Sequence, residues 1–184
     1  MLSSVRKHSI QYNILLRSGQ RYMRIFMETS RLFIRPFQES DRSILVSLLM
    51  NTFFMEFSST GGMNYDDANL RFDQILEQGH NNIGKQALGI KNSSEIIGYC
   101  GLEPFFIRDK NELELGFRLM PNYRGFGYAT EAAKAILSSS KESVFAYVNP
   151  LNFKSVNVLT KLGFTLVGEY SHNEKTDHLY KFCA

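Results

Sequence analysis

A strand pattern, a glycine turn and a helix pattern follow one another between residues 112 and 137, and this succession constrains the fold most. Apolar and polar residues alternate over 112–120, and Gly125 and Gly127 follow shortly after. Residues 129–137 then place apolar side chains on one helical face. The first N–H groups of a helix lack an internal partner, and glycine lets a phosphate approach them closely. With the positive charge of Arg124 beside it, the turn predicts a cradle for a pyrophosphate.

The strand before the turn carries two carboxylates on one face. Because successive strand residues point to opposite faces, its even-numbered residues share the polar face: Glu112, Glu114, Gly116 and Arg118. A carboxylate close to an anion cradle is a candidate for acid–base chemistry. We take Glu114 as the first candidate for a general base, and Glu103 and Glu112 as weaker ones.

Other phosphate cradles fit the turn less well. A P-loop needs a lysine followed by serine or threonine directly after its last glycine, and no such lysine is present. A dinucleotide fold needs a third glycine and follows the first strand, whereas Thr130 stands at the third position and the turn comes late in the chain.

The order of elements predicts one domain with a mixed α/β sheet flanked by helices. Helix patterns are expected over 41–53, 65–79, 129–137 and 152–162. Strands are expected over 31–35, 86–91, 95–102, 112–120, 144–148, 164–167 and 178–182. The three consecutive strands from 86 to 120 form an antiparallel meander.

Residues 1–27 differ from the rest of the chain. They contain five of the 21 basic residues and no acid, so residues 28–184 hold 16 basic against 18 acidic residues. We expect residues 1–27 to be a disordered extension outside the fold, arising from a misassigned start or serving as a transit peptide. Residues 28–184 are then the single domain.

Composition argues against several classes of function. A net charge of +3 is too small to predict nucleic-acid binding, and no apolar run reaches the length of a membrane span. Cys100 and Cys183 form no metal or redox motif, and the four histidines have no ligand spacing, so no metal is expected. Two reduced thiols fit a cytoplasmic protein, which we expect to be a monomer or a homodimer.

Four ordered segments carry a family resemblance. The run Arg124-Gly-Phe-Gly-Tyr-Ala129 resembles the Arg/Gln-x-x-Gly-x-Gly/Ala signature of the GCN5-related N-acetyltransferases (GNAT superfamily). The segments 31–36, 114–121 and 149–164 resemble the first strand, the central strand and the late helix of its ribosomal-protein alanine/serine N-acetyltransferase branch. The resemblance implies a mostly antiparallel sheet that is splayed at an acyl-CoA site.

The resemblance also implies a cosubstrate and its binding residues. Acetyl-CoA would be bound, with its pyrophosphate on the turn and its pantetheine arm between the splayed strands. Its carbonyl would be polarised by a backbone N–H near Phe117 to Leu119. Asn152 would bind the pantetheine amide. The turn residues that this assignment uses are Arg124, Gly125, Gly127, Tyr128, Ala129 and Thr130.

The implied reaction is acetyl transfer to a primary amine by direct attack, with Glu114 as base. Many family members carry a tyrosine acid in the late helix, but this chain has Leu159 there, which cannot donate a proton. Ser155, one turn earlier, is the remaining candidate acid. The acceptor is either a protein N-terminus or a small-molecule amine.

Two further hypotheses stay open. Leu159 and the short helix before Ser138 are compatible with an acyl-CoA-binding module that has little catalytic activity. A nucleotide-binding regulator would instead prefer ATP or NAD to CoA.

Overall fold

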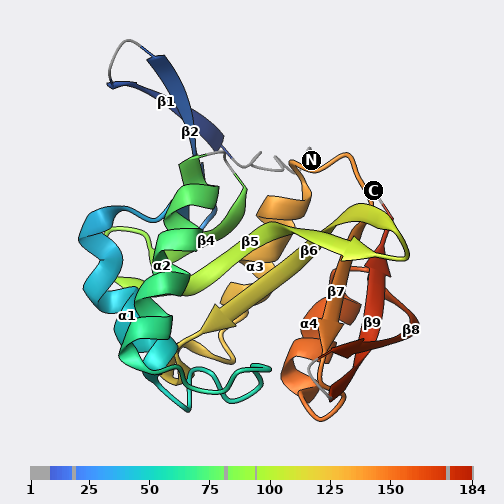
Figure 1. Cartoon of the computed structure of the whole chain (residues 1–184). Coiled ribbons are helices and arrows are strands. Elements are labelled where there is room, and N and C mark those ends of the chain that lie inside the picture. The colour runs from blue at the N-terminus through green and yellow to red at the C-terminus, as the bar shows by residue number, and fades with distance from the viewer. Residues whose placement is uncertain (1–8, 18–19, 81–82, 94, 173–174, 184) are drawn as a thin grey trace.

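The structure is a computed structural model that describes residues 9–17, 20–80, 83–93, 95–172 and 175–183. Its strands form one nine-stranded sheet in the order β1-β2-β3-β4-β5-β6-β7-β9-β8 (Figure 1). The strands are β1 (Ser9–Arg17), β2 (Gln20–Glu28), β3 (Leu32–Arg35), β4 (Gly84–Ile90), β5 (Ile96–Ile107), β6 (Lys110–Leu119), β7 (Val144–Val148), β8 (Thr165–His172) and β9 (Lys175–Phe182). The helices are α1 (Arg42–Met50), α2 (Tyr65–His80), α3 (Tyr128–Leu137) and α4 (Phe153–Lys161), with short 3-10 turns at Glu39–Asp41 and Pro121–Tyr123.

Neighbouring strands are antiparallel except at the centre of the sheet, where β6 and β7 run parallel. The two share only two Cα pairs, Leu113–Val144 and Glu114–Phe145. Beyond Glu114 the edge of β6 leaves β7, while its other edge stays paired with β5 up to Leu119. The mixed, mostly antiparallel sheet and its splay are therefore confirmed.

Helices cover both faces of the sheet and bury separate cores. On one face, α1 and α2 pack on β4 and β5 through apolar side chains that include Leu45, Phe72 and Ala87. On the other, α3 and α4 pack on the central strands, with Ala133, Ile136 and Leu159 in the core. Since each helix has one apolar stripe, this arrangement buries every stripe against the sheet.

The N-terminal region differs from the expectation of disorder. Residues 9–17 and 20–28 form the hairpin β1–β2, which projects from the body of the protein in Figure 1. It joins the main sheet through two pairs, Met27–Ile34 and Glu28–Phe33, and the Met27 side chain lies in the core. Sequence reasoning missed the hairpin because the hairpin depends on the pairing of β1 with β2, which local patterns do not reveal. Residues 1–8 and 18–19 lie outside the described residues.

The helix after the glycine turn is short, as expected. α3 ends at Leu137, and the hydroxyls of Ser138 and Ser139 donate to the carbonyls of Ala135 and Ile136. Serine hydroxyls compete in this way with the backbone at a helix end. Among the described residues, no helix has the length and hydrophobicity needed to cross a membrane.

Candidate active site

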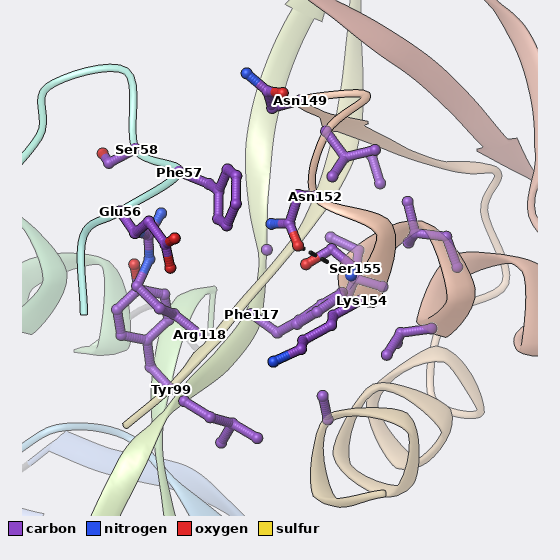
Figure 2. A pocket seen from close by; sticks show the side chains of 18 of the residues that line it. Glu56, Phe57, Ser58, Tyr99, Phe117, Arg118, Asn149, Asn152, Lys154 and Ser155 are labelled. Atoms are coloured by element: carbon purple, nitrogen blue, oxygen red, sulfur yellow. Dashed lines mark hydrogen bonds between the residues drawn. The ribbon is translucent and has the colours of Figure 1, made fainter. Parts of the chain in front are cut away.

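A cleft of about 760 Å³ opens where β6 and β7 separate. Figure 2 shows its two sides: the loop with Glu56, Phe57 and Ser58 faces the start of α4, where Asn152 and Ser155 lie. Apart from the weaker base candidate Glu112, the site residues predicted from the sequence line this one cleft: Glu103, Glu114, Phe117, Leu119, Arg124, Gly125, Gly127, Tyr128, Ala129, Thr130, Asn152 and Ser155. These residues come from β6, the glycine turn, α3 and α4. The splayed strands bring them together.

The glycine turn presents the start of α3 to the cleft. Gly125 and Gly127 have φ values of 89° and 82°, in the left-handed region that favours glycine. Gly127 is the N-cap, and the first bond of the helix runs from the Glu131 N–H to the Gly127 carbonyl. The N–H groups of Tyr128, Ala129 and Thr130 precede that bond, so the helix leaves them without an internal acceptor. The turn therefore has the form of an anion cradle.

The Arg124 side chain is held by other parts of the protein. Its guanidinium donates to the carbonyls of Leu119 and Phe53 and lies 3.4 Å from Glu56, and its N–H donates to Pro121. The side chain therefore ties the loop before α2 to the end of β6. Sequence spacing could not reveal this, because the acceptors are backbone carbonyls up to 71 residues away.

A buried charge network forms the floor of the cleft. Lys85 Nζ lies 2.6 Å from Glu103 Oε2 and 4.0 Å from Glu114 Oε2, and an Arg71 guanidinium nitrogen lies 2.6 Å from Glu103 Oε1. All four residues line the cleft, whereas Glu112 does not. Burial raises the pKa of the Glu114 carboxyl above its ordinary value, and the Lys85 charge opposes that rise. Glu103 is the reverse case, because the charges of Lys85 and Arg71 outweigh burial and lower its pKa.

The start of α4 brings Ser155 and Asn152 to the opposite wall. The Asn152 side-chain oxygen accepts a hydrogen bond from the Ser155 N–H at 3.1 Å, which caps the helix. Figure 2 shows both side chains on the cleft side of α4. Leu159, one turn further on, is 1% exposed and belongs to the core. A packed aliphatic side chain therefore occupies the position at which the family resemblance would allow a tyrosine acid.

Sequence reasoning missed several residues of the cleft. Lys85, Arg71, Tyr147 and Asp177 all line it. Lys85 gave the clearest signal, as a single charge in the otherwise uncharged strand β4. Tyr147 extends from β7, and burial together with the nearby Glu114 charge raises its pKa to about 12. Within the described residues, no group of three or more His, Cys, Asp or Glu side chains is arranged to hold a metal ion.

Comparison with known proteins agrees with this geometry. Residues 31–165 match the model of the acetyltransferase (GNAT) domain. An uncharacterised N-acetyltransferase of Bacillus subtilis, YnaD, is 26% identical over 162 residues, which cover 83% of this chain and 92% of that protein.

Two solved structures show the same fold at low sequence identity. A GNAT-family acetyltransferase from Bacillus anthracis superposes with a TM-score of 0.73 at 20% identity, covering 86% of this chain and 98% of the other. The ribosomal L7/L12 α-N-protein acetyltransferase RimL, in complex with coenzyme A, superposes with a TM-score of 0.69 at 15% identity, covering 84% and 95%. With the domain match, the splayed sheet and the cradle, the chain belongs to the GCN5-related N-acetyltransferase (GNAT) family and is an N-acetyltransferase.

Proposed function

We propose that the protein transfers an acetyl group from acetyl-CoA to a primary amine that enters the cleft directly, with Glu114 as the general base. Bound acetyl-CoA would supply the activated acetyl group as a thioester. The observation that carries the proposal is the Glu114 carboxylate, which lines the same cleft as the anion cradle and lies at the last β6–β7 pair. A base is needed because a protonated amine has no lone pair for attack.

The residues of the cradle fit a pyrophosphate. A Cβ built at Gly125 would meet no atom within 4 Å, so the surface of the turn is open to a ligand. The N–H groups at the start of α3 provide donors, and the helix dipole favours negative charge at this end. RimL, which shares the fold, is described in complex with coenzyme A. The edge of β6 around Phe117 to Leu119 is free of β7 and is available to a pantetheine arm.

Glu114 suits the base better than the other two carboxylates. Its pKa is raised by burial, and a base with a pKa closer to neutral accepts a proton more readily at neutral pH. Glu103 is engaged by Lys85 and Arg71, which stabilise its ionised form. Glu112 lies outside the cleft lining. We therefore assign to Glu114 the role of accepting the proton of the amine, directly or through one water.

Ser155 is the proposed proton donor to the departing thiolate, and water in the open cleft returns a proton to the serine oxygen as the first one leaves. Its hydroxyl belongs to the first turn of α4, where the helix dipole favours a negative charge. Asn152 uses its side-chain oxygen in the cap, so its amide group can donate to a carbonyl of the pantetheine arm. The acceptor is a protein N-terminus or a small-molecule amine.

The alternative is an acyl-CoA-binding module with little catalysis. Leu159 favours it, because a buried leucine replaces a possible acid. Thiol release from acetyl-CoA, measured with a panel of small amines and peptides, separates the two functions. Tight CoA binding without turnover on any amine would support the module, and tighter binding of ATP or NAD than of CoA would contradict both.

The role of Glu114 is tested by Glu114→Gln beside the matched control Glu112→Gln. Both carboxylates lie on β6, two residues apart, but only Glu114 lines the cleft. We expect Glu114→Gln to lower kcat about 100-fold at neutral pH, within the range typical of a lost general base. Glu112→Gln should keep wild-type turnover. Equal turnover in both variants would exclude Glu114 as the base.

A further inference from the structure

The Lys85 side chain lies on the floor of the cleft, on the sheet face that it shares with two glycines of the neighbouring strands. In the sheet register, Lys85 pairs with Gly101 on β5, and Gly101 pairs with Gly116 on β6. Paired residues of neighbouring strands share a face, and the missing side chain of Gly116 leaves room for the lysine. A Cβ built at Gly116 would lie 2.0 Å from Lys85 Nζ, which shows that the ammonium occupies that space. The lysine side chain is only 9% exposed.

The charged side chains of the floor contact one another in the order Arg71, Glu103, Lys85 and Glu114, so that each contact joins opposite charges. Glu103 and Glu114 are paired residues of β5 and β6, and the Lys85 ammonium lies beside both of them. Glu103 has two cationic partners at 2.6 Å, Lys85 and Arg71. Among the described residues, the cation nearest to Glu114 is the Lys85 ammonium, at 4.0 Å. Glu103 is thus the more strongly compensated carboxylate, and Glu114 is left available for chemistry.

On the basis of the proposed function, we propose that Lys85 is a positioning residue that keeps the buried base Glu114 ionised, while Glu103 fixes the place of the Lys85 ammonium. Without a nearby cation, a buried carboxylate takes up a proton to avoid the cost of a buried charge. A protonated Glu114 could not accept a proton from an amine. Lys85 therefore acts on the reaction through Glu114 and need not touch the acceptor.

Other charged and titratable groups surround Glu114 and enter the same balance. Lys85 on β4 and Arg71 on α2 favour its ionised form, as does His172 on β8 when protonated. Glu103 on β5 disfavours that form. Tyr147 on β7 interacts with the Glu114 charge as well. Because Lys85 is the largest of the favourable charges, its removal should have the largest effect.

The direct test is the titration of the Glu114 carboxyl by 13C NMR, in protein labelled at glutamate and assigned with Glu114→Gln. In Lys85→Met, loss of the positive charge should raise the Glu114 midpoint by about one to two pH units. In Glu103→Gln, the amide oxygen can still accept from the Lys85 ammonium while the like charge is lost, so the midpoint should fall. A purely structural role for Lys85 and Glu103 would not produce shifts of opposite sign.

The same shifts should govern the rate. With one acceptor used throughout, the acid limb of kcat/KM should move up in Lys85→Met and down in Glu103→Gln. At one pH unit below its shifted midpoint, Lys85→Met should have a kcat/KM about tenfold below its own value at high pH. This kcat/KM should recover as the pH rises. The affinity for CoA, measured by calorimetry, should stay unchanged, because the cradle lies at the start of α3.

Gly116→Ala gives an independent variant in case Lys85→Met does not fold. The added methyl group would displace the ammonium and should raise the Glu114 midpoint in the same direction as Lys85→Met. The role of Lys85 is overturned if the Glu114 midpoint is unshifted in both Lys85→Met and Gly116→Ala. It is also overturned if the midpoint moves in the same direction in Lys85→Met and Glu103→Gln. Wild-type protein that shows the expected titrations but no turnover would instead contradict the proposed function.

Discussion

The backbone N–H and the Nε of Arg31 both donate to the carboxylate of Glu131, at 2.9 and 2.7 Å, across 100 residues of sequence. The hydroxyls of Thr29 and Ser30 donate to the same carboxylate. Arg31 Nη1 also donates to the carbonyl of Phe126, inside the glycine turn. These contacts fasten the start of β3 to the first turn of α3, so they hold the cradle in place.

Glu131→Gln should destabilise the protein. The substitution replaces a charged acceptor of several hydrogen bonds. A hydrogen bond to a charged group contributes about 1.5–3 kcal/mol to the free energy of unfolding. We expect a loss of roughly 2 kcal/mol in the free energy of unfolding, measured by urea denaturation near neutral pH. The matched control is Glu142→Gln, at an exposed position, which should stay within about 0.5 kcal/mol of wild type.

The same carboxylate gives the stability a defined pH dependence. Burial raises the pKa of Glu131, but the hydrogen bonds from Thr29, Ser30 and Arg31 outweigh it and lower the pKa below 4.5. A depressed folded-state pKa stabilises the protein above the unfolded value, and this contribution is lost as the pH falls through the folded value. The stability gap between wild type and Glu131→Gln should therefore shrink below pH 4.5. A gap independent of pH would contradict the ionised contact.

Gly127→Asp should abolish CoA binding. Gly127 is the N-cap of α3, and a carboxylate there would fill the cradle and repel a pyrophosphate. We expect CoA affinity to fall by at least about 100-fold in calorimetry. Gly163→Asp is the matched control, since Gly163 has a similar φ of 88° and lies outside the cleft lining. Equal affinity in Gly127→Asp and wild type would exclude the cradle.

Asn152 should show two separable roles. Asn152→Ala removes the cap of α4 and should cost about 1 kcal/mol of stability. Asn152→Asp keeps an oxygen that can cap the helix but loses the amide donor. It should therefore keep wild-type stability while raising the KM for acetyl-CoA. If Asn152→Asp bound acetyl-CoA normally, the contact to the pantetheine arm would be ruled out.

Placing a tyrosine at position 159 should not create a catalytic acid. Leu159 is 1% exposed in the core, so Leu159→Tyr overpacks the site and should lower stability by about 1–3 kcal/mol. Thr160→Tyr, at the exposed neighbouring position, should change stability by less than about 0.5 kcal/mol. Thermal unfolding measures both. A gain in turnover without loss of stability in Leu159→Tyr would show that the site accepts the ring.

The residues near Gly127 illustrate what local pattern can reveal. Alternation up to Leu119, the two glycines and the apolar face of α3 are all visible within residues 112–137, and the structure contains the strand, turn and helix they predict. The same short-range pattern did not reveal what holds the Arg124 side chain. Its charge is next to the turn in sequence, but its guanidinium is held by Phe53, Leu119 and Glu56.

The sequence by itself determined the order of elements from β3 onward, the sheet class and the family, because periodicity, glycines and contiguous motifs are local properties. Only the tertiary structure decided how β1 and β2 pair, which partners Arg31 and Arg124 bind, and that Lys85 lies between Glu103 and Glu114. These relationships depend on strand register and on burial. A shift of one residue in β4 would turn Lys85 to the other face of the sheet, so its role exists only once the strands have paired.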